Sequence, residues 1–175
     1  TDHSFANIMN ALKTAVSQED YEGVMTRFAG LLVLDAVIGN TDRHHENWAL
    51  FRQFEKETVE LSPSYDHASS LGRELQDGRR KEILVSGIDA YVLKGKGAIF
   101  GQASGKHAEN PLDLVRWAKA RHPDWFRPWL EKIDYIRAGH IADVLAKMPE
   151  NVMSQTAKDF CAAFLCYTLD ELRRM

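Results

Sequence analysis

The sequence predicts a mainly α-helical fold, a helical bundle with one small β-hairpin. Three observations carry this prediction. Apolar residues recur at helical spacing over most of the chain, two short strand-like segments stand near residues 48–61, and most of the eleven glycines gather in one central stretch. The 175 residues suffice for one domain with a sizeable hydrophobic core.

Helical periodicity is clearest in the amino-terminal part of the chain. Residues 4–16 carry apolar side chains at i, i+3, i+4 and i+7, which predicts a first amphipathic helix. Residues 19–38 are apolar around most of the helix circumference, which indicates a buried central helix. Gly39 and Asn40 end it, because both tolerate a left-handed backbone. Asp35 lies inside this apolar run, so we expect it to hold loop amides or an arginine.

The middle of the chain combines two short strands with a long irregular stretch. Residues 48–51 and 58–61 are interpreted as a hairpin around a charged turn. Residues 67–109 are rich in glycine and charge, and we expect long mobile loops with one short helix there. The helical pattern resumes at Pro111, with Asn110 as the cap. Further helices are expected over residues 124–136, 138–147 and 154–175.

Composition and charge argue against several classes of protein. The net charge of −3 leaves no broad positive field, so neither direct nucleic-acid binding nor a membrane partner is expected. Two basic runs, residues 79–81 and 94–96, are interpreted as solvated loops. No apolar run approaches the roughly 20 residues that span a bilayer, and no secretory signal is present. Cys161 and Cys166 match neither zinc nor redox spacing, which predicts free thiols in a reducing cytoplasm.

Two short stretches carry the residues that predict chemistry. Asp42 and Asn47 stand five positions apart directly after the buried helix, and Asp66 follows 24 residues after Asp42. The hairpin between them folds the chain back, so Asp66 can return to the neighbourhood of Asn47. Phosphoryl transfer uses such a set, because one carboxylate accepts the hydroxyl proton while an amide and a second carboxylate hold Mg²⁺. Asp42 taken alone is better explained as a cap of the next turn.

The segments IGNTDRHHENWALF (38–51) and LSPSYDHASSLGREL (61–75) closely resemble the C-terminal lobe of HipA-like serine/threonine kinases. The core D-R-H-x-x-N also resembles the catalytic loop of phosphoinositide kinases, which share the kinase-like fold. The resemblance implies that Asp42 is the catalytic base, that Asn47 and Asp66 bind Mg²⁺, and that ATP donates a phosphoryl group to a protein hydroxyl. It implies more weakly that His44 assists proton transfer, and a local hydrogen bond that shapes the loop is the equal alternative.

The resemblance also suggests roles for residues beside these motifs. Kinases place the strand after the catalytic loop beneath the adenine, which implies that Ala49 or Leu50 contacts the base; packing within the hairpin is the equal alternative. Ser69 and Ser70 follow where kinases place an activation segment. They are candidate phosphorylation sites, although an ordinary turn is the favoured interpretation.

The histidines near the motifs invite a metal interpretation of another kind. A zinc site could draw on neighbouring residues of the two loops. Zinc sites favour ligands spaced along a helix or between elements, so a zinc site made of adjacent loop residues is the less favoured interpretation. The residues concerned are His44, His45, Glu46 and His67.

A complete kinase also needs an amino-terminal lobe with a phosphate-covering loop and a strand lysine. The 41 residues before Asp42 are predicted to be helical, contain no G-x-G-x-x-G, and place Lys13 in a helix. We therefore expect residues 1–175 to form a single C-terminal kinase lobe, completed by further sequence or by a separate amino-terminal-lobe chain. HipA-like kinases often belong to toxin–antitoxin systems, so the resemblance implies an antitoxin partner. The alternatives are a lipid or small-molecule kinase of this fold and a non-catalytic interaction module.

Overall fold

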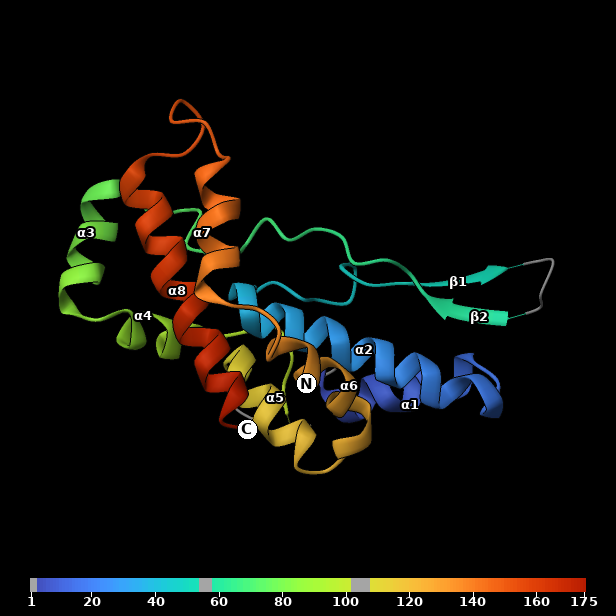
Figure 1. Ribbon diagram of the computed structural model, residues 1–175. Coiled ribbons are helices and arrows are strands. Elements are labelled where there is room, and N and C mark those ends of the chain that lie inside the picture. Colours follow the sequence, from blue (N-terminus) through green and yellow to red (C-terminus); the bar gives the residue numbers. More distant parts are fainter. Residues whose placement is uncertain (1–2, 54–57, 102–107) are drawn as a thin grey trace.

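The computed structural model describes residues 3–53, 58–101 and 108–175, and it is mainly helical (Figure 1). Two strands, β1 (Leu50–Gln53) and β2 (Thr58–Leu61), form an antiparallel hairpin. The predicted fold class, a helical bundle with a small hairpin, is confirmed. The helices are α1 (Phe5–Ala15), α2 (Gln18–Ile38), α3 (Asp77–Ser86), α4 (Ile88–Lys94), α5 (Pro111–Lys119), α6 (Pro123–Ile133), α7 (Ala138–Ala146) and α8 (Gln155–Arg173).

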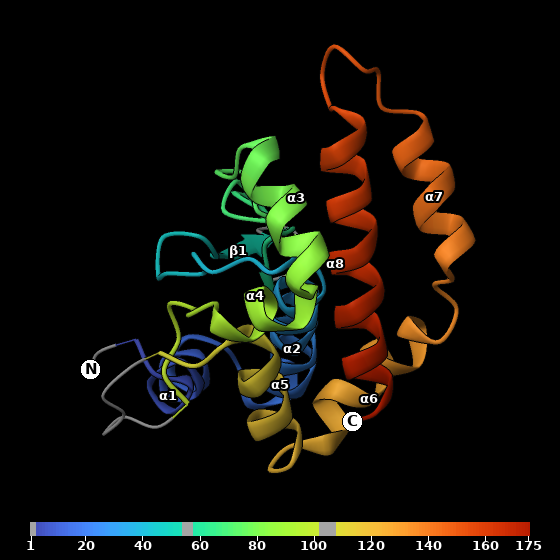
Figure 2. The ribbon, with the colours of Figure 1, turned by 90° about the vertical axis from the view of Figure 1, so that its left-hand side faces the viewer.

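Helix α2 runs through the middle of the molecule, with α1, α5, α6 and α8 packed around it (Figures 1 and 2). Its central side chains, among them Met25 and Phe28, are completely buried, as the sequence predicted. Gly30 lets α6 approach closely, because a Cβ at this position would lie 2.5 Å from the indole of Trp129. A helix held on several sides is a rigid support for the loop that follows it.

The hairpin lies beside α2 and has a simple register. Leu50 pairs with Leu61 and Gln53 with Thr58, so the first strand begins two residues later than the predicted segment 48–51. Trp48 lies outside the strand because its ring packs edge-on against Phe28, with the ring centres 5.2 Å apart. The tip of the predicted charged turn falls at 54–57, outside the described residues.

The central segment 67–109 differs from its prediction. It contains two helices, α3 and α4, separated by Gly87 at a φ of 110°. The apolar periodicity of α3 is weak, since Ile83 is its buried side chain. Ion pairs one turn apart support the helix instead, from Arg79 to Glu82 and from Arg80 to Asp77. The basic run 79–81 is therefore helical rather than a solvated loop. Residues 102–107 of this segment lie outside the described ranges.

The carboxyl-terminal helices follow the prediction closely. Asn110 caps α5 by accepting the N–H of Leu112 at 2.9 Å, and α6 ends at Ile133, three residues before the predicted end at 136. The thiols of Cys161 and Cys166 are free, as predicted, and burial raises the pKa of the Cys161 thiol. Within the described residues, no helix combines the length and the apolar character that crossing a membrane requires.

Candidate active site

The candidate site begins at the carboxyl end of α2. Gly39 adopts a left-handed φ of 63° and ends the helix as predicted. A Cβ at this position would lie 2.2 Å from the ring of Phe164 on α8, so a larger residue requires that ring to move. The buried Asn40 follows. Its side-chain oxygen accepts the N–H of Asp42 at 3.2 Å, which fixes the entry into the loop that carries Asp42.

A buried ion pair lies directly behind this loop. Asp35 is 3% exposed and Arg43 is 2% exposed. The guanidinium of Arg43 donates two hydrogen bonds to the Asp35 carboxylate, at 2.8 Å from Nε and 2.7 Å from the terminal nitrogen. The amide of Asn40 donates a third bond to the same carboxylate at 2.8 Å. The structural role predicted for Asp35, to hold a loop amide and an arginine, is confirmed.

Arg43 connects three segments through its remaining donors. It donates to the backbone carbonyl of Asn47 in the first loop and to the carbonyl of Tyr65 in the second, the latter at 3.3 Å. Its other terminal nitrogen lies 3.3 Å from Nδ1 of His67. Tyr65 and His67 are the immediate neighbours of Asp66 in the sequence. One side chain therefore brings the Asp42 loop and the Asp66 loop together at the end of α2.

Asp42 presents its carboxylate at the surface on a fixed backbone. Its side chain is 51% exposed, while its carbonyl accepts the N–H of His44 at 2.8 Å. The Nε2 atom of His44 lies 3.9 Å from the Asp42 carboxylate, and its Nδ1 accepts the N–H of Glu46 at 3.2 Å. His44 thus makes the local hydrogen bond that shapes the loop and also faces the carboxylate.

The side-chain amide of Asn47 is oriented by a hydrogen bond within its own loop. The residue is buried, and its amide nitrogen donates to the carbonyl of Asp42 at 2.7 Å. That bond fixes the orientation of the amide, because only the nitrogen can donate. No residue in the described ranges donates a hydrogen bond to the amide oxygen of Asn47. Together with the Asp66 carboxylate it supplies hard oxygen donors, the kind that Mg²⁺ prefers.

Asp66 occupies an unusual backbone conformation. Its φ is 52°, in the left-handed region that residues other than glycine enter at a steric cost. The residue is exposed. The preceding residue, Tyr65, is bonded to the first loop, because its hydroxyl donates to the carbonyl of Glu46 at 2.8 Å. A non-glycine residue kept in this region is a common sign of a functional constraint.

We expect Asp66→Gly to leave the free energy of unfolding unchanged or to raise it by up to about 1 kcal/mol. Glycine adopts a positive φ without the steric cost, although it loses more conformational freedom on folding. Urea denaturation measures the effect. The control is Ser64→Gly in the same loop, where φ is not positive; a loss of about 0.5–1 kcal/mol is expected there. A larger loss in Asp66→Gly than in Ser64→Gly would mean that the carboxylate stabilises the fold.

The remaining predicted residues, in the hairpin and in the segment after Asp66, differ in their exposure and in their hydrogen bonds. Leu50 packs against the hydrophobic core, whereas Ala49 is exposed and its carbonyl accepts the N–H of Ser62 at 2.8 Å. The carbonyl of Ser69 accepts the N–H of Thr41 at 3.4 Å. The hydroxyl of Ser70 is buried and has no hydrogen-bond partner among the described residues. Ala49 is therefore the better placed of the two hairpin residues to contact a base.

Three histidine rings lie in a row beside the first loop. The ring of His45 is 5.9 Å from that of His44 and 6.3 Å from that of His3. Burial lowers the pKa of His3 against the raising effect of its bond to the Ala98 carbonyl, and the two neighbouring histidines lower it further. Across residues 3–53, 58–101 and 108–175, no three histidine, cysteine or carboxylate side chains are grouped to hold a metal ion.

Arg43 organises the site, although the sequence motifs predict no role for it. A usable signal existed, because a carboxylate inside an apolar helix requires a buried partner. Arg43 is the first arginine after Asp35. The sequence could not show that the same guanidinium would also reach Asn47 and Tyr65, since this depends on the return of the hairpin.

The fold is kinase-like. A crystal structure of the Helicobacter pylori proinflammatory kinase CtkA superimposes with a TM-score of 0.78, at 20% identity, over 99% of this chain and 60% of that chain. At this identity the match establishes the fold, and the chain spans 60% of the length of that kinase. Residues 1–86 match the family model of the HipA-like C-terminal domain. This segment contains every predicted site residue, and the resemblance to the HipA-like C-terminal domain is confirmed. No curated protein matches the chain.

Proposed function

We propose that the chain is the C-terminal lobe of a HipA-like kinase that transfers the γ-phosphoryl group of ATP to a serine or threonine hydroxyl of a protein. The observation that carries this proposal is the set of hydrogen bonds that the Arg43 side chain donates. Its guanidinium bonds to the backbone on both sides of the site, at Asn47 and at Tyr65. This arrangement supports one reaction centre made of Asp42, Asn47 and Asp66.

In the proposed reaction, Asp42 orients the acceptor hydroxyl and receives its proton. The hydroxyl oxygen forms a bond to the γ-phosphorus as the bond from that phosphorus to the β-phosphate oxygen breaks. The products are a phosphoester and ADP. The exposed carboxylate of Asp42 suits this role, because an acceptor can approach it from solvent. His44 would keep the loop in place through the hydrogen bond that its Nδ1 accepts from the N–H of Glu46.

Asn47 and Asp66 are the residues that would hold Mg²⁺. The donor set fits, because the amide of Asn47 uses its nitrogen on the Asp42 carbonyl and leaves its oxygen for a cation. When bound, the ion neutralises negative charge on the phosphates. Ala49, exposed beside the first strand, would contact the adenine. Part of the complete enzyme would come from further sequence or a second chain that grips the phosphates, as expected for a lobe that spans 60% of a kinase of this fold.

Calorimetric titration of Mg-ATP tests this proposal. We expect magnesium-dependent binding, and we expect Asp66→Asn to weaken it about tenfold or more, because the amide is a poorer ligand for a hard cation. The titration should be run on the chain and, where the gene encodes sequence before Thr1, on a version extended with that sequence. Binding in the extended version alone would support a separate phosphate-gripping lobe. Binding in neither, or binding indifferent to magnesium, would contradict the proposal and favour a non-catalytic interaction module.

A further inference from the structure

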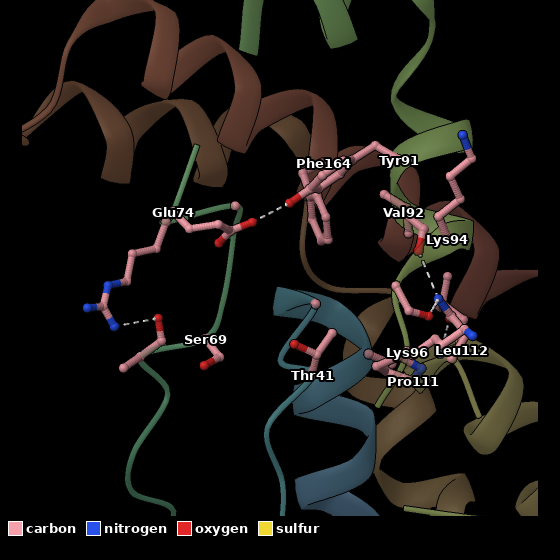
Figure 3. Close-up of a pocket in the computed structure, with 17 residues that line it drawn as sticks. Thr41, Ser69, Glu74, Tyr91, Val92, Lys94, Lys96, Pro111, Leu112 and Phe164 are labelled. Atoms are coloured by element: carbon pink, nitrogen blue, oxygen red, sulfur yellow. Dashed lines mark hydrogen bonds between the residues drawn. The ribbon is translucent and has the colours of Figure 1, made fainter. Parts of the chain in front are cut away.

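A cavity of about 880 Å³ opens beside the candidate active site (Figure 3). One wall is the segment after Asp66, with Ser69 and Glu74. The opposite wall is the end of α4, the start of α5 and Phe164 of α8. Figure 1 shows α4 and the hairpin on opposite sides of the end of α2. Under the proposed function the adenine lies over the hairpin, which leaves this cavity on the acceptor side.

The cavity adjoins the proposed base through Thr41. This residue lines the cavity and directly precedes Asp42. Gly95 packs against it, since a Cβ at Gly95 would lie 3.7 Å from the methyl group of Thr41. The two lysines on either side of Gly95, Lys94 and Lys96, therefore stand next to the catalytic loop. A ligand in the cavity would therefore lie close to Asp42, the residue proposed to receive the proton of the acceptor hydroxyl.

The charge of the cavity is opposite in sign to that of the whole chain. Three cationic side chains line it, Arg73, Lys94 and Lys96, against one carboxylate, Glu74. The carboxylate already accepts the hydroxyl of Tyr91 at 3.0 Å, the bond that crosses the cavity in Figure 3. Neither lysine forms an ion pair with a carboxylate of the described residues. The amino end of α5 adds the partial positive charge of a helix terminus.

The backbone that carries these lysines is fixed before any ligand binds. The buried Asn110 donates to the carbonyls of Val92 and Gly95, both at 2.8 Å. Its own oxygen caps α5. Such preorganisation lowers the entropy that binding costs. The remaining lining is partly apolar, with Tyr91, Leu112 and Phe164, so the cavity offers surface for side chains as well as charge for an anion.

We propose that this cavity binds the acceptor segment of the protein substrate and selects segments with acidic residues beside the phosphorylated hydroxyl. The inference rests on the proposed function and adds the substrate class to it. Unpaired cations at a preformed site favour carboxylates of a partner by charge complementarity. The apolar walls and the size of the cavity favour a peptide over a free inorganic anion.

Fluorescence anisotropy with short labelled peptides tests the inference without ATP. One peptide carries a single serine flanked by glutamates, and the other carries the same serine flanked by lysines. We expect the acidic peptide to bind the chain about tenfold more tightly at low ionic strength, with the difference shrinking as salt is added. The double variant Lys94→Glu/Lys96→Glu should abolish or invert the preference. Lys147→Glu, an exposed lysine on no wall of the cavity, should preserve it.

The inference would be overturned by equal binding of the two peptides or by a preference that survives the double variant. Inorganic phosphate that displaces the acidic peptide at concentrations near the affinity of that peptide would overturn it as well. Absence of acidic-peptide binding at millimolar concentration would also overturn it. The peptide-binding assay contains no ATP and does not depend on phosphoryl transfer. Failure of Mg-ATP binding therefore refutes the proposed function separately from this inference.

Discussion

Asp42→Asn is expected to lower the rate of phosphoryl transfer by about 10²- to 10⁴-fold, the range that a positioned general base contributes. The amide keeps the size of the carboxylate but cannot accept the hydroxyl proton. The fold should be unaffected, since the side chain is 51% exposed and its carboxylate lies 3.9 Å from Nε2 of the neighbouring His44. The measurement is transfer of labelled γ-phosphate to a protein serine, in the version of the protein that binds Mg-ATP.

The chain offers a matched control for this variant. Glu46 belongs to the same loop, is 76% exposed, and its carboxylate also lies 3.9 Å from His44. Glu46→Gln removes one negative charge beside the same ring, so it should leave the rate near that of the native chain. Near-native turnover in Asp42→Asn, or an equal loss in both variants, would contradict the role of Asp42 as the base.

Arg43→Met is expected to lower the free energy of unfolding by about 3–5 kcal/mol, the cost of leaving a buried charge without its partner. Asp35 would retain a carboxylate that is 3% exposed and keep the Asn40 amide as its remaining donor. Arg43→Lys should also be harmful, because an ammonium cannot make the paired bonds of a guanidinium. Urea denaturation measures these losses, and the m-value reports whether the compactness of either state changes.

A double-mutant cycle separates the ion pair from the rest of the site. In Asp35→Leu/Arg43→Met no buried charge remains, so the loss should be well below the sum of the two single losses. The surface pair of Arg27 and Glu60 provides the control. Arg27 is 53% exposed, and Arg27→Met should change the stability by less than about 1 kcal/mol. Additive losses at Asp35 and Arg43 would show that the two side chains do not act as one unit.

The residues most predictable from the sequence are those with a local cause. The bounds of α2 follow from its apolar circumference and from the left-handed Gly39. The cap of α5 follows from Asn110 and Pro111. The spacing of Asp42, Asn47 and Asp66 predicted a shared site, and the structure brings their two loops together on Arg43. Their chemical roles remain predictions, which the variants above test.

The residues that sequence reasoning missed depend on partners far away in the chain. Helix α3 has weak apolar periodicity because it covers α8 with few buried side chains, so the pattern resembled a loop. The basic run at 94–96 resembled a solvated loop for the same reason. It borders a cavity only because Asn110 holds its backbone and Thr41 packs against Gly95.

The sequence by itself determined the helices outside the central segment 67–109, the hairpin and the three residues to which chemistry is assigned, because these depend on periodicity, caps and spacing along the chain. Only the tertiary structure decided that one guanidinium joins Asp35, Asn47 and Tyr65, and that Gly95, between two lysines, packs against Thr41. The physical reason is that a buried charge or a cavity is defined by everything that surrounds it. Those neighbours come from segments that meet when the chain folds.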